Sequence, residues 1–260
     1  MRDAEVRLRA AGCQTPRLDA ELLVAEALGV DRATLFRVPE RALSPVAAGR
    51  VAERVGRRAA REPVAYIVGR RGFRRLELAV DRRVLIPRPE TELLVDVALG
   101  AVPVGGRVHD VGTGSGAVAL ALKDERPDLE VSASDVSEDA VVVAQTNVAR
   151  LALDVEMSIA RGLPVGVYDL VVANLPYIAE DEWPALVPEI VRYEPVEAVI
   201  GGGPDGLDAI RALVDGAPSG TVLALEHAPD QAPAVRALLR GAESFRGLGG
   251  GEEVTLGRAP

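Results

Sequence analysis

The residues of this chain whose types and spacing best suit chemistry are Asn174-Leu175-Pro176-Tyr177. They follow a short valine-rich run, residues 169–173, which is too brief for a helix and typical of a buried parallel strand. Pro176 ends the strand ladder and biases Leu175 towards an extended backbone. The asparagine amide and nearby main-chain carbonyls are therefore expected at the carboxyl edge of a sheet, where ligands of open α/β sheets bind. An asparagine oxygen and a main-chain carbonyl together suit one NH2 group, and the Tyr177 ring can lie on a planar amide or base.

A glycine-rich turn lies upstream of this segment. Residues 108–111 are predicted to form a first strand, which runs into Gly112-Thr113-Gly114-Ser115-Gly116 and then into a helix over residues 117–123. Glycines in such a turn let the backbone approach a ligand at the amino terminus of the helix. The spacing is not the dinucleotide fingerprint, and no Lys-Ser/Thr pair follows, which excludes a P-loop.

A carboxylate at the end of the second predicted strand extends the pattern. Asp135 follows residues 131–134 and lies 23 positions after Gly112, where a carboxylate can accept both hydroxyls of a ribose. With Asp110 before the turn, the segment resembles motif I of S-adenosylmethionine-dependent methyltransferases. Glycines alone could be a tight turn, but together with Asp135 and Asn174 on successive strand ends they indicate a cofactor site.

The elements that must position these residues differ along the chain. Residues 1 to about 60 show helical periodicity, with Gly29 a helix end, Asp31 a helix cap and Ser44-Pro45 the start of a helix through residue 55. Residues 66–69 and 76–80 look extended, with a hairpin around Gly72. From residue 107 strands and helices alternate, which predicts a mainly parallel sheet of about seven strands. Residues 155–159 and 169–173 are expected to be the third and fourth strands, followed by strands at residues 196–200, 221–225 and in a terminal pair around 254–256.

Composition sets the broad class. The chain has 260 residues, 48% apolar and 27% charged, which is ordinary for a soluble globular protein with ample core material. No run approaches the length of a membrane span, and the charged start lacks the apolar core of a signal peptide, so the cytoplasm is the expected location. Cys13 is the only cysteine and the two histidines are isolated, so no metal site is expected.

The net charge of −9 is unevenly distributed. Residues 41–88 contain thirteen arginines and four acidic residues, a local charge of +9, so the remainder carries −18. This basic stretch could meet an acidic or RNA-associated partner. Alternatively it is a solvated helix face, since Lys123 is the only lysine and arginine is the usual cation of this chain.

Taken together, these segments resemble the bacterial release factor glutamine N5-methyltransferases of the HemK/PrmC family. The resemblance runs from the helical module to the end of the chain. Its most specific part is the run Pro-Arg-Pro-Glu-Thr-Glu at residues 87–92, supported by residues 62–69, the motif at 110–116, the Gly-Gly-Pro-Asp-Gly-Leu run within 201–207, and Leu225-Glu226-His227.

The resemblance implies an α/β fold: a seven-stranded Rossmann-like class I methyltransferase sheet, preceded by a small helical domain and a β-hairpin linker. The implied boundaries are 1–70 for a substrate-recognition domain, 71–88 for the linker and 89–260 for the methyltransferase domain. The implied reaction moves a methyl group from S-adenosylmethionine to the glutamine amide nitrogen of the Gly-Gly-Gln motif in peptide-chain release factors. In this reading Asn174 and the Leu175 carbonyl hold the amide hydrogens and Tyr177 packs on the amide plane. Neither a membrane nor nucleic acid is an expected partner.

Two departures from the family pattern keep alternatives open. Leu175 stands where the family has proline, and Asn-Leu-Pro-Tyr resembles the rRNA adenine N6-dimethyltransferases, so an adenine N6-methyltransferase acting on RNA or DNA is one rival. Arg161 stands in a shortened loop where the family usually has an acidic residue against the adenine. A non-catalytic paralogue with a weakened pocket is therefore the other rival.

Overall fold

The computed structural model describes residues 1–37 and 43–260, which cluster into two compact units. The first unit comprises Met1–Arg70 together with Val187–Tyr193, and the second comprises Arg71–Leu186 together with Glu194–Pro260. The first unit is thus discontinuous in sequence. Residues 38–42, which include the start of the basic stretch, lie outside the described residues.

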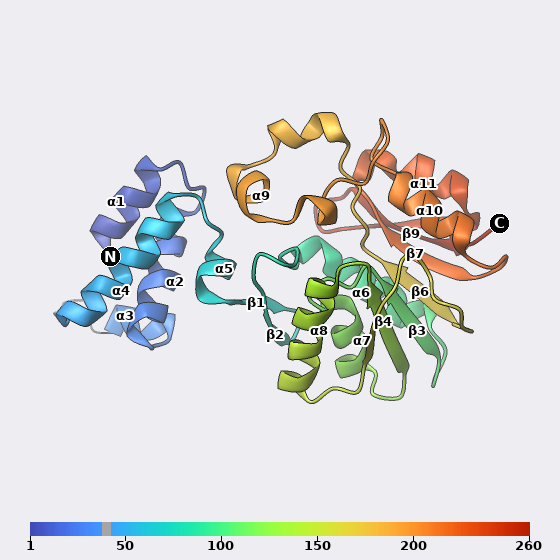
Figure 1. Cartoon of the computed structure of the whole chain (residues 1–260), viewed down its shortest axis with the longest axis horizontal. Helices are drawn as coiled ribbons and strands as arrows, with labels where there is room; N and C mark the ends of the chain where they lie inside the picture. Colours follow the sequence, from blue (N-terminus) through green and yellow to red (C-terminus); the bar gives the residue numbers. More distant parts are fainter. Residues whose placement is uncertain (38–42) are drawn as a thin grey trace. The chain divides into compact units, whose positions relative to one another are not determined.

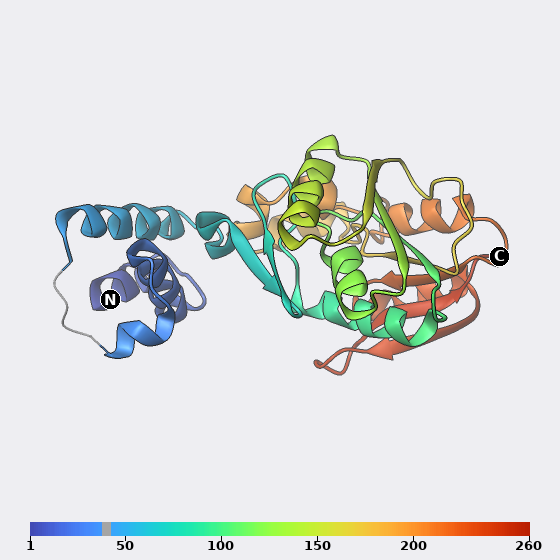
Figure 2. The ribbon, with the colours of Figure 1, turned by 90° about the horizontal axis from the view of Figure 1, so that it is seen from below.

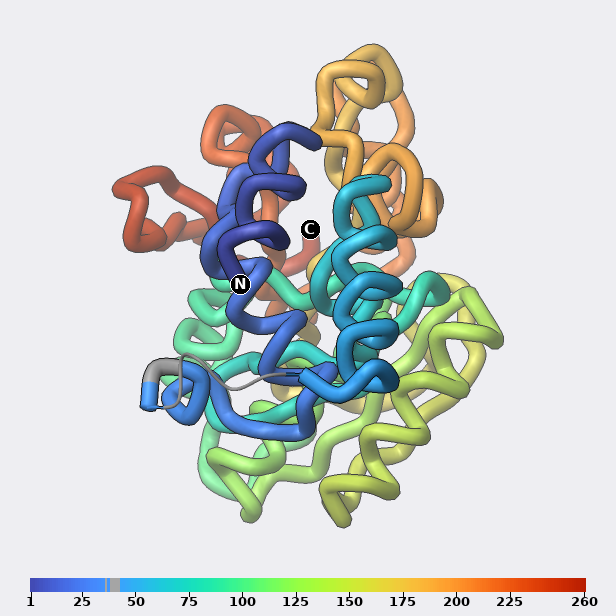
Figure 3. The backbone as a smooth tube through the Cα atoms, turned by 90° about the vertical axis from the view of Figure 1, so that its left-hand side faces the viewer, coloured from blue at the N-terminus to red at the C-terminus, as the bar shows by residue number. Residues whose placement is uncertain are grey.

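Short helices build the first unit, and α1, α2 and α4 lie side by side (Figures 2 and 3). Their ends follow local signals: Ser44 caps α4 by accepting the Ala47 N–H at 3.2 Å, and Gly29 ends α2 with φ +66°. A small apolar core that includes Leu8, Leu23 and Val55 holds these helices together. The helices are α1 (Arg2–Ala10), α2 (Pro16–Leu28), α3 (Arg32–Arg37), α4 (Pro45–Ala59), α5 (Val64–Val68) and α9 (Pro188–Tyr193).

The α9 segment joins the first unit through ion pairs. Glu189 accepts from Arg58 Nη1 at 2.7 Å and from Arg61 Nη2 at 2.6 Å, and the Tyr193 hydroxyl donates to the Ala60 carbonyl at 2.8 Å. Arg58 is buried and is also paired with Asp19 at 2.7 Å. Because a buried guanidinium needs partners, Glu189 is part of what holds α4 in place.

A seven-stranded sheet with strand order β5-β4-β3-β6-β7-β9-β8 forms the centre of the second unit (Figure 1). Strands β3 to β7 are parallel, β9 is antiparallel to β7, and β8 is antiparallel to β9 at the edge of the sheet. This confirms the predicted seven-stranded α/β sheet. The strands are β3 (Arg107–Val111), β4 (Glu130–Asp135), β5 (Glu156–Ile159), β6 (Leu170–Ala173), β7 (Val222–Glu226), β8 (Arg240–Arg246) and β9 (Glu252–Arg258).

Helices cover both faces of this sheet. On one face α6 (Glu92–Ala101), α7 (Ala117–Glu125) and α8 (Glu138–Leu151) pack on one apolar cluster, and on the other α10 (Asp208–Gly216) and α11 (Ala232–Leu238) pack on a second. The four residues of β6 alternate between the two clusters and are all buried, so Leu170 and Val172 face one side while Val171 and Ala173 face the other. A strand buried on both faces explains its continuous apolar sequence.

Three local predictions were wrong. Residues 66–69 were expected to be extended, but α5 forms there because Pro63 precedes it and Gly69 ends it with φ +76°. The hairpin of β1 (Arg70–Phe73) and β2 (Leu76–Ala79) turns at Arg74, not Gly72. Arg74 adopts φ +49° while its guanidinium bonds Asp96 at 2.7 Å and also pairs with Glu125, two acids far away in sequence.

The third error is the strand expected at residues 196–200. Pro195 instead precedes a 3₁₀ turn, Val196–Ala198, and only an isolated bridge joins Ile200 to Ile178. The sheet reaches seven strands through β8, whose mixed polar sequence gives little strand signal. No helix of the described residues is long and apolar enough to cross a membrane.

Candidate active site

The glycine turn at the end of β3 bends against the end of β4. The Gly112 and Thr113 N–H groups both donate to the Ser134 carbonyl, at 2.9 and 3.0 Å. Gly112, Gly114 and Gly116 have φ values of +75°, +55° and +84°, a region that residues with a Cβ rarely adopt. The turn therefore requires its three glycines, and it brings main chain to the amino terminus of α7.

Asp135 lies directly beside this turn. Its carboxylate accepts the Gly114 N–H at 2.9 Å and the Ser137 N–H at 2.9 Å, one on each oxygen. A carboxylate oxygen has two lone pairs, so both oxygens keep the capacity to accept a further hydroxyl. The residue predicted to bind a ribose is thus fixed against the predicted glycine turn, and the donor and acceptor set fits a nucleoside cofactor.

Asp110 supports the turn from inside the protein. It accepts the Thr113 hydroxyl at 2.7 Å and the Ala119 N–H at 3.3 Å, and it is almost fully buried. Burial raises the pKa of this carboxyl to about 7. Asp110 therefore anchors the turn to α7 and does not face a ligand.

Asn174 lies at the same edge of the sheet as the turn. Val111 is in register with Ser134 of β4 and with Ala173 of β6, so the three strands end side by side. The Asn174 side chain donates through Nδ2 to the Thr91 hydroxyl at 2.9 Å. Among the described residues no group donates to its Oδ1, which leaves this oxygen available to a substrate.

The loop that follows, residues 174–178, is held by close main-chain contacts. The Leu175 side chain rests on the glycine turn, since a Cβ on Gly112 would lie 2.8 Å from Leu175 Cδ2. A Cβ on Gly201 would lie 2.3 Å from the Pro176 oxygen, and one on Gly206 would lie 2.1 Å from the Tyr177 oxygen. Glycines at 201 and 206 are therefore needed for the chain to pass behind this loop.

Comparisons with known proteins agree along the whole chain. The family model of the PrmC N-terminal domain matches residues 1–69, and that of the methyltransferase small domain matches residues 89–195. The release factor glutamine methyltransferase of Xylella fastidiosa is 42% identical over 97% of both chains. The chain belongs to the release factor glutamine methyltransferase family. The Pseudomonas aeruginosa member is 43% identical over 93% of this chain and 92% of its own.

A solved structure supports the fold. A methyltransferase from Pyrococcus furiosus aligns with a TM-score of 0.52 at 16% identity, over 79% of this chain and 96% of that one. The family predicted from the sequence is confirmed, and with it the enzyme class and its S-adenosylmethionine cofactor. Because these relatives are named release factor glutamine methyltransferases, the alternative function of an adenine N6-methyltransferase is not favoured.

Sequence reasoning missed two buried residues behind Asn174 of this methyltransferase. The Thr91 hydroxyl, which accepts from Asn174, donates to Glu226 Oε1 at 3.2 Å, and both residues are buried. Glu226 Oε2 is buried without a partner among the described residues. Burial, with the charges of Glu90 and Glu253, raises the pKa of Glu226 to about 8. Thr91 and Glu226 lie in motifs that carried the family resemblance, but their contact joins residues 135 positions apart.

Hydrogen bonds hold the Pro-Arg-Pro-Glu-Thr-Glu run, residues 87–92, from two sides. Arg88 Nη2 donates to the buried Glu194 at 2.5 Å, and Glu194 also accepts the Ile86 N–H at 3.3 Å. Glu92 accepts the Arg74 N–H at 3.1 Å, which connects the run to the β1–β2 hairpin. This run is therefore a rigid segment that carries Thr91 towards Asn174.

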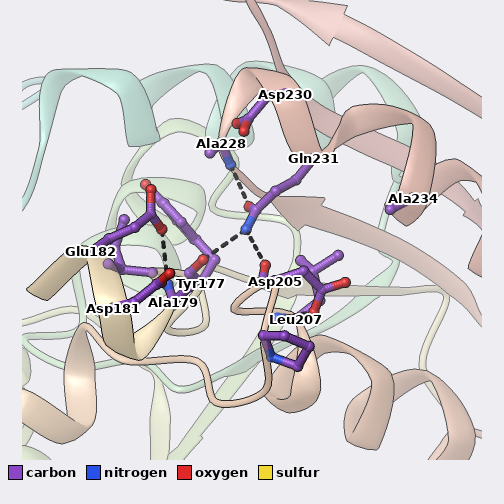
Figure 4. Close-up of a pocket in the computed structure, with 12 residues that line it drawn as sticks. Tyr177, Ala179, Asp181, Glu182, Asp205, Leu207, Ala228, Asp230, Gln231 and Ala234 are labelled. Carbon is purple, nitrogen blue, oxygen red and sulfur yellow. Dashed lines mark hydrogen bonds between the residues drawn. The ribbon is translucent and has the colours of Figure 1, made fainter.

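Behind the residue 174–178 loop lies a cavity of about 440 Å³ (Figure 4). Gln231 points into it and donates through Nε2 to the Tyr177 carbonyl at 2.7 Å and the Asp205 carbonyl at 2.8 Å. Its Oε1 accepts the Ala228 N–H at 2.9 Å. Gln231 thus fixes the main chain of Tyr177 from behind. Burial raises the pKa of the Tyr177 phenol, and the nearby Glu226 carboxyl adds to this rise.

The region expected to receive the adenine is open. Val136 and Ile159, at the ends of β4 and β5, are 56% and 58% exposed and flank Asp135. Two exposed apolar side chains beside the Asp135 carboxylate suit a flat base. Arg161 is exposed in the loop that follows, whose main chain is held by a 2.9 Å bond from the Ala160 N–H to the Asp135 carbonyl.

The histidines have structural partners. His109 lies between the hydroxyls of Ser132 and Ser134 at 2.8 and 2.9 Å, and His227 Nε2 lies 2.7 Å from the Thr255 hydroxyl. Burial lowers the pKa of both imidazoles, so both are neutral at physiological pH. Over the described ranges, no group of three His, Cys, Asp or Glu side chains is placed to hold a metal ion.

Proposed function

We propose that this protein transfers the methyl group of S-adenosylmethionine to the side-chain amide nitrogen of the glutamine in the Gly-Gly-Gln motif of peptide-chain release factors. The observation that carries the proposal is the Asn174 amide, whose Nδ2 is bound by Thr91 at 2.9 Å while Oδ1 has no donor among the described residues. Family membership supplies the substrate class, because the relatives are named release factor glutamine methyltransferases. We place this reaction in the cytoplasm.

The cofactor would lie over the glycine turn. The main chain of residues 112–116 can approach it closely because three of the five residues are glycines with positive φ. Asp135 would accept its ribose hydroxyls, and Val136 and Ile159 would flank its base. When bound, the cofactor supplies a methyl group on a positively charged sulfur.

The substrate amide would be held by two acceptors of this chain. Asn174 Oδ1 and the Leu175 carbonyl would each accept one N–H of the glutamine NH2 group, and Tyr177 would pack on the amide plane. This arrangement fixes the direction of a weak nucleophile whose lone pair is delocalised into its own carbonyl. Catalysis then rests on orientation and on fixed dipoles, which explains why no side chain is needed as a strong base.

Replacing the family's proline by Leu175 leaves this arrangement possible. The acceptor at position 175 is a main-chain carbonyl, which leucine and proline share. Pro176 remains in place, and Gly201 and Gly206 hold the loop from behind. We therefore propose that the catalytic function is retained, in preference to a non-catalytic paralogue.

A methyl-transfer assay with radiolabelled S-adenosylmethionine tests the proposal. The protein is incubated with unmodified release factor and, in parallel, with RNA. We expect label on the glutamine of release factor and none on RNA. Asn174→Ala should lower the rate by about 100-fold or more at saturating cofactor, by analogy with loss of one oriented hydrogen bond in an oxyanion hole. Asn174→Asp keeps an oxygen but adds charge, and should also be slow.

A matched control is Gln145→Ala, which removes an exposed amide from α8, far from the edge where the strands end. It should keep the rate of the parent protein. Methylation of release factor at the parent rate in Asn174→Ala refutes the assignment of Asn174. Label on RNA that depends on Asn174 would instead support the adenine rival.

A further inference from the structure

We propose that Thr91 and Glu226 are positioning residues for methyl transfer: they set which end of the Asn174 amide faces the substrate. This inference rests on the proposed function and adds two residues to it. Neither residue would touch the substrate amide, since both act through Asn174.

Asn174, Thr91 and Glu226 form a hydrogen-bonded relay, and they come from three segments of the second unit. Thr91 ends a 3₁₀ turn, Pro89–Thr91, while Asn174 and Glu226 lie at the ends of the neighbouring strands β6 and β7. Asn174 Nδ2 donates to Thr91 Oγ1 at 2.9 Å, and Thr91 Oγ1 donates to Glu226 Oε1 at 3.2 Å. Thr91 is 4% exposed and Glu226 is 2% exposed, so water does not compete for these contacts.

The direction of the relay follows from the chemistry of its last member. An ionised carboxylate only accepts, so the single hydroxyl proton of Thr91 goes to Glu226. The Thr91 oxygen can then only accept from Asn174, and Nδ2 is the only end of that amide that donates. Oδ1 is consequently turned away from Thr91, towards the place where a substrate NH2 group needs an acceptor.

Protonation of Glu226 removes this constraint. A protonated Glu226 can donate to Thr91, and Thr91 can then donate to Asn174 Oδ1. The amide would turn over and present Nδ2 to the substrate NH2 group, so two donors would face each other. The amide orientation that supports methyl transfer therefore requires Glu226 as a carboxylate.

Several groups around Glu226 determine the pKa of its carboxyl group. The pKa of Glu226 is raised to about 8: burial contributes most to the rise, the negative charges of Glu90 before Thr91 and Glu253 on β9 add to it, and hydrogen bonds from Thr91 and the Tyr177 phenol oppose it. Because the folded-state pKa lies above the usual value, the carboxyl is protonated below about pH 8 and ionised above it. The rate of methyl transfer should accordingly rise with pH across this value.

Three near-isosteric variants test the relay, with kcat and KM for release factor measured from pH 6 to pH 9.5 and cofactor affinity measured by calorimetry. Thr91→Val removes the hydroxyl and should lower kcat at least about ten-fold with unchanged cofactor affinity. Thr91→Ser restores a hydroxyl and should recover most of that loss. Glu226→Gln has no titrating proton, so it should remove the rise of kcat near pH 8 whichever end of its amide faces Thr91. Thr146→Val, on the exposed side of α8, is the matched control and should behave as the parent.

A double-mutant cycle distinguishes an effect that acts through Asn174 from a loss of rate caused by general disturbance of the fold. If Thr91 acts only through Asn174, adding Thr91→Val to Asn174→Ala should cost nothing further. An additive loss, parent-like kcat in Thr91→Val, or a pH rise that persists in Glu226→Gln each overturns the inference. These outcomes are distinct from failure of the proposed function, in which the parent protein itself does not methylate release factor.

Discussion

Removal of the Asp135 carboxylate gives the most direct measure of cofactor binding. In the structure this group accepts the N–H groups of Gly114 and Ser137, both at 2.9 Å, and keeps further acceptor capacity on each oxygen. A hydrogen bond to a charged group contributes about 1.5–3 kcal/mol, and water that replaces the carboxylate would recover part of the loss from the two ribose hydroxyls, so the net loss should be near that of one such bond. Asp135→Ala should therefore weaken S-adenosylmethionine binding by about 1.5–3 kcal/mol, or about 10- to 160-fold.

The same substitution has a second, separable effect. The Gly114 and Ser137 N–H groups would lose their acceptor; both residues are only partly buried, so water can replace it and the cost in folding free energy should lie below the range of about 1–3 kcal/mol for a fully buried unpaired donor. The melting temperature should therefore fall as well. Titration calorimetry with S-adenosylmethionine measures the first effect, and calorimetric unfolding without cofactor measures the second.

Asp139→Ala is a suitable control for this measurement. Asp139 is an exposed acid in the first turn of α8, near Asp135 in sequence, with no bond to the glycine turn. It should keep the cofactor affinity of the parent protein. Affinity unchanged in Asp135→Ala, with the protein folded, would falsify the assignment of the ribose to this carboxylate.

Three further predictions address the departures from the family and the loop. Leu175→Pro should change kcat for release factor only modestly, since the main-chain carbonyl is common to both residues; a loss near that of a missing acceptor would contradict this. Arg161→Asp, which restores the usual family acid, should strengthen S-adenosylmethionine binding in calorimetry, and weaker binding would refute an adenine contact there. Gly206→Ala places a Cβ 2.1 Å from a main-chain oxygen at φ +74°, so it should destabilise the fold by more than about 1 kcal/mol in denaturant unfolding. Gly100→Ala, which meets nothing within 4 Å, is its control and should not destabilise.

The role of the first unit leads to one more prediction. Deletion of residues 1–69 should abolish methylation of intact release factor, because these residues include none of the proposed site and are proposed to recognise the substrate protein. Cofactor binding should remain measurable, which serves as the folding control. Full activity of the truncated chain would place recognition elsewhere.

Much of the fold could be predicted because its signals are local. The buried strand β6 appears as a continuous apolar run, and Ser44 and Gly29 mark helix ends through contacts within a few residues. The errors arose where distant residues decide the conformation. The hairpin turns at Arg74, whose guanidinium is bound by Glu125 and Asp96. Both acids are distant in sequence, so no pattern near residue 74 predicts these contacts.

The candidate site divides in the same way. Asp135 and Asn174 follow strands directly, so parallel pairing is enough to place them at one edge. Thr91 and Glu226 were visible only as members of the runs that carried the family resemblance, because their importance depends on a contact between residues 135 positions apart and on burial. Sequence spacing cannot show which way an amide is turned, and side-chain partners can.

The discontinuity of the first unit has a consequence for the order in which the chain folds during synthesis. Arg58 and Arg61 are made early, whereas their partner Glu189 is made more than 120 residues later. Until then the emerging helices carry a guanidinium that is buried in the finished protein and lacks one of its two carboxylates. The amino-terminal unit can therefore reach its final packing only after strands β3 to β6 have been made, although β7, β8 and β9 are made later still, and a chain that stops before residue 187 should hold its first helices loosely.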